Sequence, residues 1–286
     1  MIRICLALSI TCLLLTDASI ADNKPEKELV QQRYELMASH IGSLQFKSAA
    51  FEIAAHPEVE PIYRYTDPAR GYVGGAIWVV GASGRPAVIV DTELHPNFAN
   101  KFGSRIVFEM LAVAEQELSM TGPMSWTPRS SGVTWSELPV KESPAATPQL
   151  RTLQLRQLAK RFAANETVGK EVCELRLLPQ PIYRYRLDED EAAEGAIFIL
   201  AYGQNPEILL FLEPHGDHWQ VGAGRLSGAR SMVLTFDSAS VWSAGAVNWQ
   251  SSEPYTATNR SVKIPGFDRQ GNPATEETDG APPVQP

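Results

Sequence analysis

The chain has 286 residues, and its 33 acidic side chains outnumber its 25 lysines and arginines, so the formal net charge is −8. Because no segment is basic, the composition argues against a nucleic-acid partner and against binding to anionic lipid, both of which need clustered positive charge. A chain of this length can bury a core, or two smaller ones, without disulfide staples.

Residues 1–21 have the pattern of a secretory signal. Arg3 is the short basic region, residues 4–15 are apolar, and Ser19, Ile20 and Ala21 form a small-residue cleavage site. The apolar run is shorter than the roughly 20 residues that span a bilayer. We therefore expect a secreted, periplasmic or cell-envelope protein that begins at Asp22 and is not inserted in a membrane after signal cleavage.

The sequence PIYRY at residues 61–65 recurs unchanged at residues 181–185, 120 positions later. The residues that follow also match at the same offset of 120, since Pro86, Glu93 and His95 correspond to Pro206, Glu213 and His215. Such self-similarity predicts a tandem duplication in which each copy is one folding unit.

Each copy is expected to open with an amphipathic helix. In the first copy, apolar residues recur at helical spacing, at Val30, Tyr34, Met37, Ile41 and Leu44. In the second, Thr147 is a predicted N-cap, Pro148 occupies the first helical position, and the apolar face contains Leu155, Leu158 and Phe162.

Short apolar or alternating runs then predict strands. In the first copy they fall near residues 62–66, 75–81, 87–93, 105–113 and 133–138. In the second they fall near residues 182–187, 195–202, 207–213, 219–226, 231–236 and 240–242. The connections at 82–86 and 203–206 are too short for a crossover helix, so neighbouring strands should be antiparallel.

These elements predict an α+β fold of two tandem repeats, each an N-terminal helix followed by an antiparallel β meander. The expected units are a first repeat at 22–138, a proline-rich linker at 139–148 and a second repeat at 149–250. Residues 251–286 lose periodicity and gain proline, glycine and acidic residues, which predicts a disordered tail.

The repeated Glu-x-His is the first candidate for chemistry. Residues i and i+2 of a strand share a face, so Glu93 could meet His95, and Glu213 could meet His215, with His218 nearby. Carboxylate and imidazole ligands suit zinc or a similar ion, which would make the chain a metal-assisted hydrolase. The plainer interpretation is a polar hairpin turn at residues 215–218, and no metal or other cofactor is predicted with it.

The repeated Tyr-Arg-Tyr is the second candidate, because tyrosines two apart on a strand form one aromatic surface and the arginine faces away. The binding candidates are Tyr63, Arg64, Tyr65, Tyr183, Arg184 and Tyr185. Alternatively, the tyrosines fill the core between sheet and helix, and the arginines pair across strands with Asp91, Glu93 or Glu213.

Residues 174–185, together with GAIF at 195–198 and NPEILL at 205–210, resemble an uncharacterised family of exported planctomycete proteins. Residues 61–65, 75–78 and 84–86 resemble the upstream half of that family, whereas the small residues at 221–224 depart from its pattern. The resemblance implies an exported or cell-envelope location and no known activity.

The chain lacks the Gly-x-Ser-x-Gly, His-Glu-x-x-His and Cys-x-x-Cys motifs. The leading hypothesis is therefore a non-catalytic binding or structural module of the cell envelope. Its expected partner is a protein or a cell-surface polymer, bound in a groove or on a sheet face shared by the two repeats. The alternative is the metal-assisted hydrolase.

Overall fold

The computed structural model describes residues 24–48, 60–81, 84–115, 117–122, 125–187 and 190–274. Of these residues, 49% lie in strands and 15% are helical, with only two α-helices among them. The predicted α+β class is therefore wrong, and the described chain is mostly β. The prediction missed five strands: β1 (Gln45–Ser48), β6 (Leu118–Thr121), β8 (Phe162–Val168), β9 (Glu171–Leu177) and β16 (Tyr255–Ser261).

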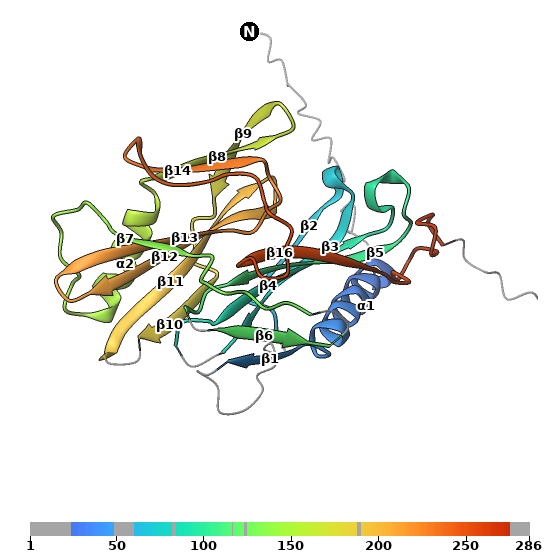
Figure 1. The fold of residues 1–286 in the computed structure, drawn as a ribbon, viewed down its shortest axis with the longest axis horizontal. Coiled ribbons are helices and arrows are strands. Elements are labelled where there is room, and N and C mark those ends of the chain that lie inside the picture. Colours follow the sequence, from blue (N-terminus) through green and yellow to red (C-terminus); the bar gives the residue numbers. More distant parts are fainter. Residues whose placement is uncertain are drawn as a thin grey trace, which may run out of the picture.

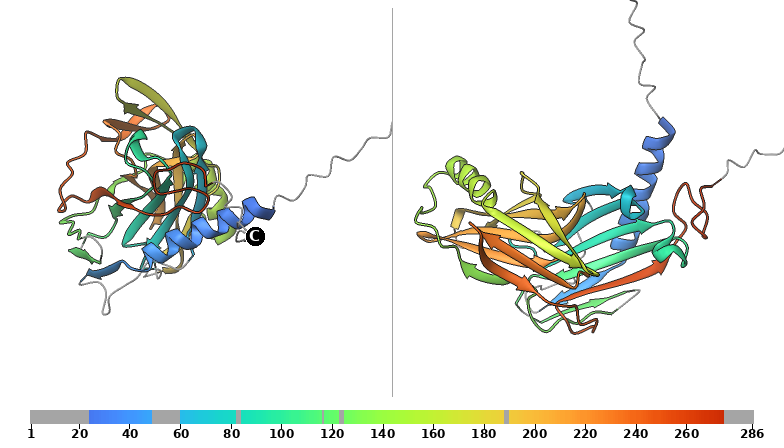
Figure 2. Two further views of the ribbon diagram at one scale, coloured as in Figure 1. Left: turned by 90° about the vertical axis from the view of Figure 1, so that its right-hand side faces the viewer. Right: turned by 90° about the horizontal axis from the view of Figure 1, so that it is seen from above.

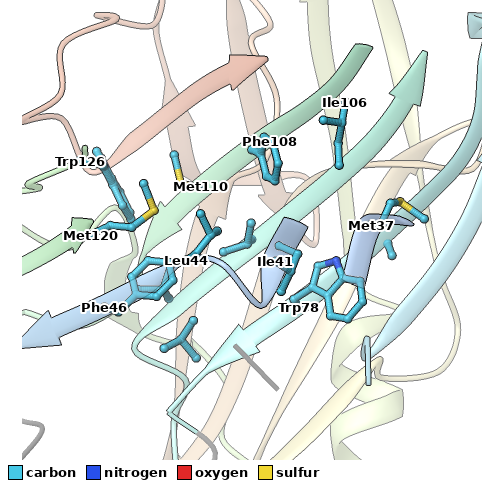
Figure 3. Packing of buried hydrophobic residues seen from close by; sticks show 14 of the residues in the cluster. Met37, Ile41, Leu44, Phe46, Trp78, Ile106, Phe108, Met110, Met120 and Trp126 are labelled. Atoms are coloured by element: carbon cyan, nitrogen blue, oxygen red, sulfur yellow. The ribbon is translucent and has the colours of Figure 1, made fainter. Parts of the chain in front are cut away.

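The two helices are α1 (Lys24–Ile41) and α2 (Pro148–Ala159). The side chain of Thr147 accepts a hydrogen bond from the backbone N–H of Leu150, as predicted for the N-cap of α2. The helices lie toward opposite ends of the molecule with strands between them (Figure 2). Each covers the outer face of one sheet, and Figure 3 shows Met37 and Ile41 of α1 in the core with Trp78 and Phe108.

The first sheet has the strand order β16-β5-β4-β3-β2, with every neighbouring pair antiparallel. Four of its strands fall where they were predicted: β2 (Tyr63–Asp67), β3 (Tyr72–Val80), β4 (Val88–His95) and β5 (Arg105–Ala112). Side chains of a strand alternate between its faces. Ala76 and Trp78 therefore pack on the α1 side, whereas Ile77 and Val79 face the second sheet.

The second sheet has nine strands in the order β15-β14-β8-β9-β11-β12-β13-β7, with β10 also pairing with β11. Its predicted members are β7 (Thr134–Glu137), β10 (Tyr183–Leu187), β11 (Asp190–Tyr202), β12 (Asn205–His215), β13 (His218–Arg225), β14 (Ser231–Phe236) and β15 (Ala239–Ala244). Strands β1 and β6 form a separate antiparallel pair. The expectation that neighbouring strands are antiparallel is confirmed in every described pair of the second sheet.

Two strands, β7 and β16, pair outside the predicted units. Strand β7 precedes α2 but pairs with β13, while β16, near the other end of the chain, returns to β5. Figure 1 shows green β7 beside orange β13 and red β16 beside β5. Two separate helix-plus-meander repeats are thus excluded, because each half supplies the outer strand of the other half's meander.

The prediction of a disordered tail at 251–286 is wrong for its described part, residues 251–274. This part contains strand β16, and the side chain of Ile264 is fully buried. The sequence of β16, YTATNRS, contains strand-favouring tyrosine and threonine but no apolar run, and the edge of β5 supplies its hydrogen-bond partners. Residues 275–286 of that tail, and the predicted signal at 1–21, lie outside the described residues.

The two sheets face each other across an apolar core. It contains Ile77, Val79, Ile89 and Leu111 from the first sheet, and Ile197, Ile199, Leu209 and Phe211 from the second. Beyond this apolar region, charged side chains from both sheets meet, and that is where the candidate site lies.

Candidate functional site

A cavity of about 700 Å³ opens where the two halves of the chain meet. Its wall combines Arg70 and Tyr72 from the start of the first sheet with Glu109 of β5. The second half contributes Glu166 of β8 and Glu207 of β12, so neither half forms the cavity alone.

Arg70 is held by a short turn. It ends the 3₁₀ helix η1 (Pro68–Arg70), whose first turn is capped when the Asp67 side chain accepts a hydrogen bond from the Arg70 backbone N–H. Gly71 follows at φ 82°, a left-handed conformation that glycine adopts without strain. The chain thereby reverses into β3 with the Arg70 side chain directed at the other half.

The guanidinium of Arg70 binds two carboxylates of the second half. It lies 2.5 Å from Glu207 Oε1 and 3.5 Å from Glu166 Oε1, and it stacks 4.4 Å above the ring centroid of Tyr202. Asn205 Nδ2 donates a second hydrogen bond to Glu207, at 3.0 Å. Both glutamates are about 1% exposed, so this is a buried ion-pair network.

The wall has more acceptors than donors. Glu166 Oε1 and Asn205 Oδ1 are buried and accept no hydrogen bond from any described residue. Glu166 Oε2 accepts a hydrogen bond from the hydroxyl of Ser227, at 3.4 Å. Burying a carboxylate or amide oxygen without a donor costs free energy, so these atoms lower the stability of the empty site.

Burial and repulsion between carboxylates set the protonation of the site. Burial, followed by the charge of Glu166, raises the pKa of Glu207 to about 8, although Arg70 opposes the shift. Burial and the nearby Glu93 likewise raise the pKa of Glu109 well above its ordinary value. Near neutral pH, Glu207 is therefore mostly protonated.

The first predicted Glu-x-His lies directly behind the cavity wall. His95 Nε2 is 2.9 Å from Glu93 Oε2, and the His95 ring packs 4.2 Å from the ring of Tyr72. The Tyr65 hydroxyl donates to Asp91 at 2.8 Å and to Glu93 at 3.3 Å. Glu93 and His95 thus come together as the strand periodicity indicated.

The second Glu-x-His is arranged differently. Glu213 accepts two hydrogen bonds from Arg85, at 2.8 and 2.6 Å, and another from the Tyr185 hydroxyl. His215 and His218 flank the exposed turn of the β12–β13 hairpin, with their ring centroids 5.1 Å apart. No group of three or more His, Cys, Asp or Glu side chains in the described ranges is placed to hold a metal ion. These residues therefore do not fit the metal centre of the hydrolase hypothesis.

The repeated tyrosines stack in pairs between the two sheets. The ring centroids of Tyr63 and Tyr65 are 5.7 Å apart, and those of Tyr183 and Tyr185 are 6.1 Å apart. Tyr65 and Tyr185 are buried; Tyr185 belongs to the core between the sheets, and Tyr65 stacks on Tyr63, which packs against that core. None of the four tyrosines belongs to the clusters that contain the helices, so the predicted place between sheet and helix is wrong. The Tyr65 hydroxyl binds Asp91 and Glu93, and the Tyr185 hydroxyl binds Glu213. These are the carboxylates that were predicted to pair with Arg64 and Arg184.

The repeated arginines point elsewhere. Arg64 pairs with Glu60 at 2.8 Å and lies over the ring of Tyr34, whereas Arg184 binds Thr152 and Glu194. The predicted pairing with Asp91, Glu93 or Glu213 is wrong, because successive side chains of a strand face opposite sides of the sheet.

Sequence reasoning missed the cavity residues Arg70, Glu109, Glu166, Asn205 and Glu207. A signal was present for two of them, since Glu109 interrupts the apolar run of β5 and Glu207 directly precedes the apolar run of β12. A carboxylate within or beside such a run indicates a buried charge that needs a partner. Arg70 and Glu166 carry no local signal, because only the packing of the two halves brings them there.

No protein-family model, curated protein or solved structure matches this chain. No described helix has the length and hydrophobicity to span a membrane.

Proposed function

We propose that this chain is a non-catalytic, exported binding protein that holds its ligand in the acidic cavity between its two halves. The observation that carries the proposal is that two buried oxygens of the cavity wall, Glu166 Oε1 and Asn205 Oδ1, accept no hydrogen bond from any described residue, although Glu166 also lies 3.5 Å from Arg70. Folding rarely retains such atoms unless another molecule satisfies them.

The size of the cavity suits a small molecule or one side chain of a larger partner. About 700 Å³ lies within the range of ordinary ligand pockets, and contributions from both halves are typical of ligand sites at domain interfaces. A partner protein or a cell-surface polymer would insert a single group here. Export is supported by the signal-like residues 1–21.

The arrangement of Arg70 favours binding over catalysis. Its guanidinium already pairs with Glu207 and Glu166, so these carboxylates are held in a network and are not free to act as independent acid and base.

The test fills the cavity without disturbing the core. Ala246 is exposed and lines the cavity, so Ala246→Trp should occlude it, whereas Ala239→Trp places the same ring on exposed β15 away from the cavity. Thermal-shift measurements with amines, sugars and carboxylic acids should find compounds that stabilise the wild type and Ala239→Trp but not Ala246→Trp. If every stabilising compound acts equally on all three proteins, the cavity is not the binding site.

A further inference from the structure

We infer that the cavity binds an organic cation carrying a primary ammonium or guanidinium group. The inference rests on the proposed function and specifies its ligand class. Its first support is the shortage of donors: Glu166 Oε1 and Asn205 Oδ1 are acceptors only in the observed arrangement, so the missing partner must bring N–H or O–H groups.

The second support is the charge of the wall. Four glutamates line the cavity, Glu109, Glu166, Glu171 and Glu207, against two arginines, Arg70 and the exposed Arg230. Of the two arginines, Arg70 pairs with Glu166 and Glu207. A third arginine, Arg225, is not part of the lining, and its nitrogens donate to the backbone carbonyls of Ser227, Ala229 and Gly245. Once Glu207 and Glu109 are ionised, the lining carries more negative than positive groups, which favours a cation over a neutral or anionic ligand.

The third support is that the wall already binds one cation of this kind. The Arg70 guanidinium is held by a carboxylate oxygen at 2.5 Å and by the face of Tyr202 at 4.4 Å. Two further aromatic side chains, Tyr72 and Trp249, line the same cavity, and Trp249 is 57% exposed. These rings provide apolar surface for the carbon chain of an amine.

Competing ligand classes fit less well. A divalent metal needs several acidic or imidazole ligands around one point, and the described residues contain no such group. A neutral sugar would supply hydroxyl donors and aromatic contacts but would leave the excess charge unbalanced. A quaternary ammonium would balance the charge but has no N–H to donate.

Because Glu207 titrates in the accessible pH range, the affinity for a cation should depend on pH. Its pKa of about 8 is set by burial, by Glu166 and by Arg70, with Ser227 also facing it, and Glu109 and Tyr72 lie across the cavity. A cation prefers the ionised carboxylate. Affinity should therefore rise from pH 6 to pH 9, and binding near pH 8 should release a proton.

The experiment measures binding to the whole protein by isothermal titration calorimetry, using 1,4-diaminobutane, 1,4-butanediol, choline and calcium chloride. We expect 1,4-diaminobutane to bind, and the uncharged diol, choline and calcium to bind at least about 10-fold more weakly. Glu207→Gln and Glu166→Gln should each weaken diaminobutane binding by at least about 10-fold. Glu174→Gln removes one charge from the exposed face of β9 outside the cavity and should leave binding unchanged.

The possible failures are distinguishable. If a neutral sugar or diol binds and Ala246→Trp abolishes that binding, the cavity is a binding site and the cationic class is overturned. Equal binding of choline overturns the requirement for N–H donors, and stronger binding of calcium overturns the organic cation. No binding of diaminobutane at any pH overturns the inference outright. Because the wild-type ligand series decides these outcomes, the conclusion does not depend on whether a glutamine variant folds.

Discussion

At the scale of single residues, Tyr65 and Tyr185 each pack a ring against a neighbouring strand and bind a buried carboxylate with the hydroxyl group. Their rings lie across the neighbouring strand at Gly75 and Gly195, and their hydroxyl groups reach buried carboxylates one strand further on. An aromatic ring over a glycine covers backbone that would otherwise lose packing. Packing and the need to satisfy a buried acid thus explain why the second tyrosine of PIYRY is the same in both copies.

This arrangement predicts that neither glycine tolerates a side chain. In Gly75→Ala the added Cβ would lie 2.3 to 2.6 Å from ring atoms of Tyr65, so we expect a loss of about 1–3 kcal/mol in the free energy of unfolding. Urea unfolding measures this loss. Gly245→Ala is the control, since nothing lies within 4 Å of its added carbon. Equal stability of the two variants would refute the packing argument.

At the scale of elements, Arg85 connects the β3–β4 turn of the first sheet to β12 of the second. It makes a two-pronged ion pair with Glu213, which is 2% exposed, and its guanidinium stacks 4.2 Å from Trp135 of β7. The Trp135 ring in turn occupies the space above Gly222 of β13. Gly222 of β13 therefore makes room for the ring of Trp135, on a strand supplied by the other half.

Removal of Arg85 should weaken this junction. Arg85→Met leaves Glu213 buried without its cation and should cost about 2 kcal/mol, less than for a fully buried pair because the Arg85 side chain is 36% exposed. The double variant Arg85→Met with Glu213→Gln should be more stable than Arg85→Met alone, since it removes the buried, unpaired charge of Glu213. Chemical denaturation of the single and double variants checks this, and a double variant less stable than Arg85→Met would contradict it.

At the scale of the whole molecule, the exchange of β7 and β16 links the two halves. Each half's meander depends on a strand from the other, and the apolar core between the sheets draws on both. Neither half can then unfold without exposing the sheet edge and the core of the other. The cavity, which needs both halves, should be lost in the same event.

We therefore expect the protein to unfold in one cooperative transition. In calorimetry, the measured enthalpy should equal the van't Hoff enthalpy. Gly75→Ala, although placed in the first sheet, should shift that single transition and not split it. Two resolved transitions, or a variant that lowers only one of them, would show that the halves are independent units.

The sequence by itself determined the local structure. Periodicity located both helices, including the Thr147 cap, and most strands of the two meanders, and it indicated that Glu93 and His95 share a face. These features depend on neighbours a few residues apart, so the local pattern contains them. Strands with polar or mixed composition, such as β16, were missed because their partners lie far away in the chain. The resemblance to exported proteins and the predicted signal stay predictions.

Only the tertiary structure decided the fold class, the pairing of the outer strands and the location of the cavity. Arg70 is separated from Glu207 by 137 residues, and nothing near either one indicates the other. Burial of apolar faces sets how the sheets meet, and the charged groups then fall where the apolar core ends. The candidate site is a consequence of that packing, which no short stretch of sequence encodes.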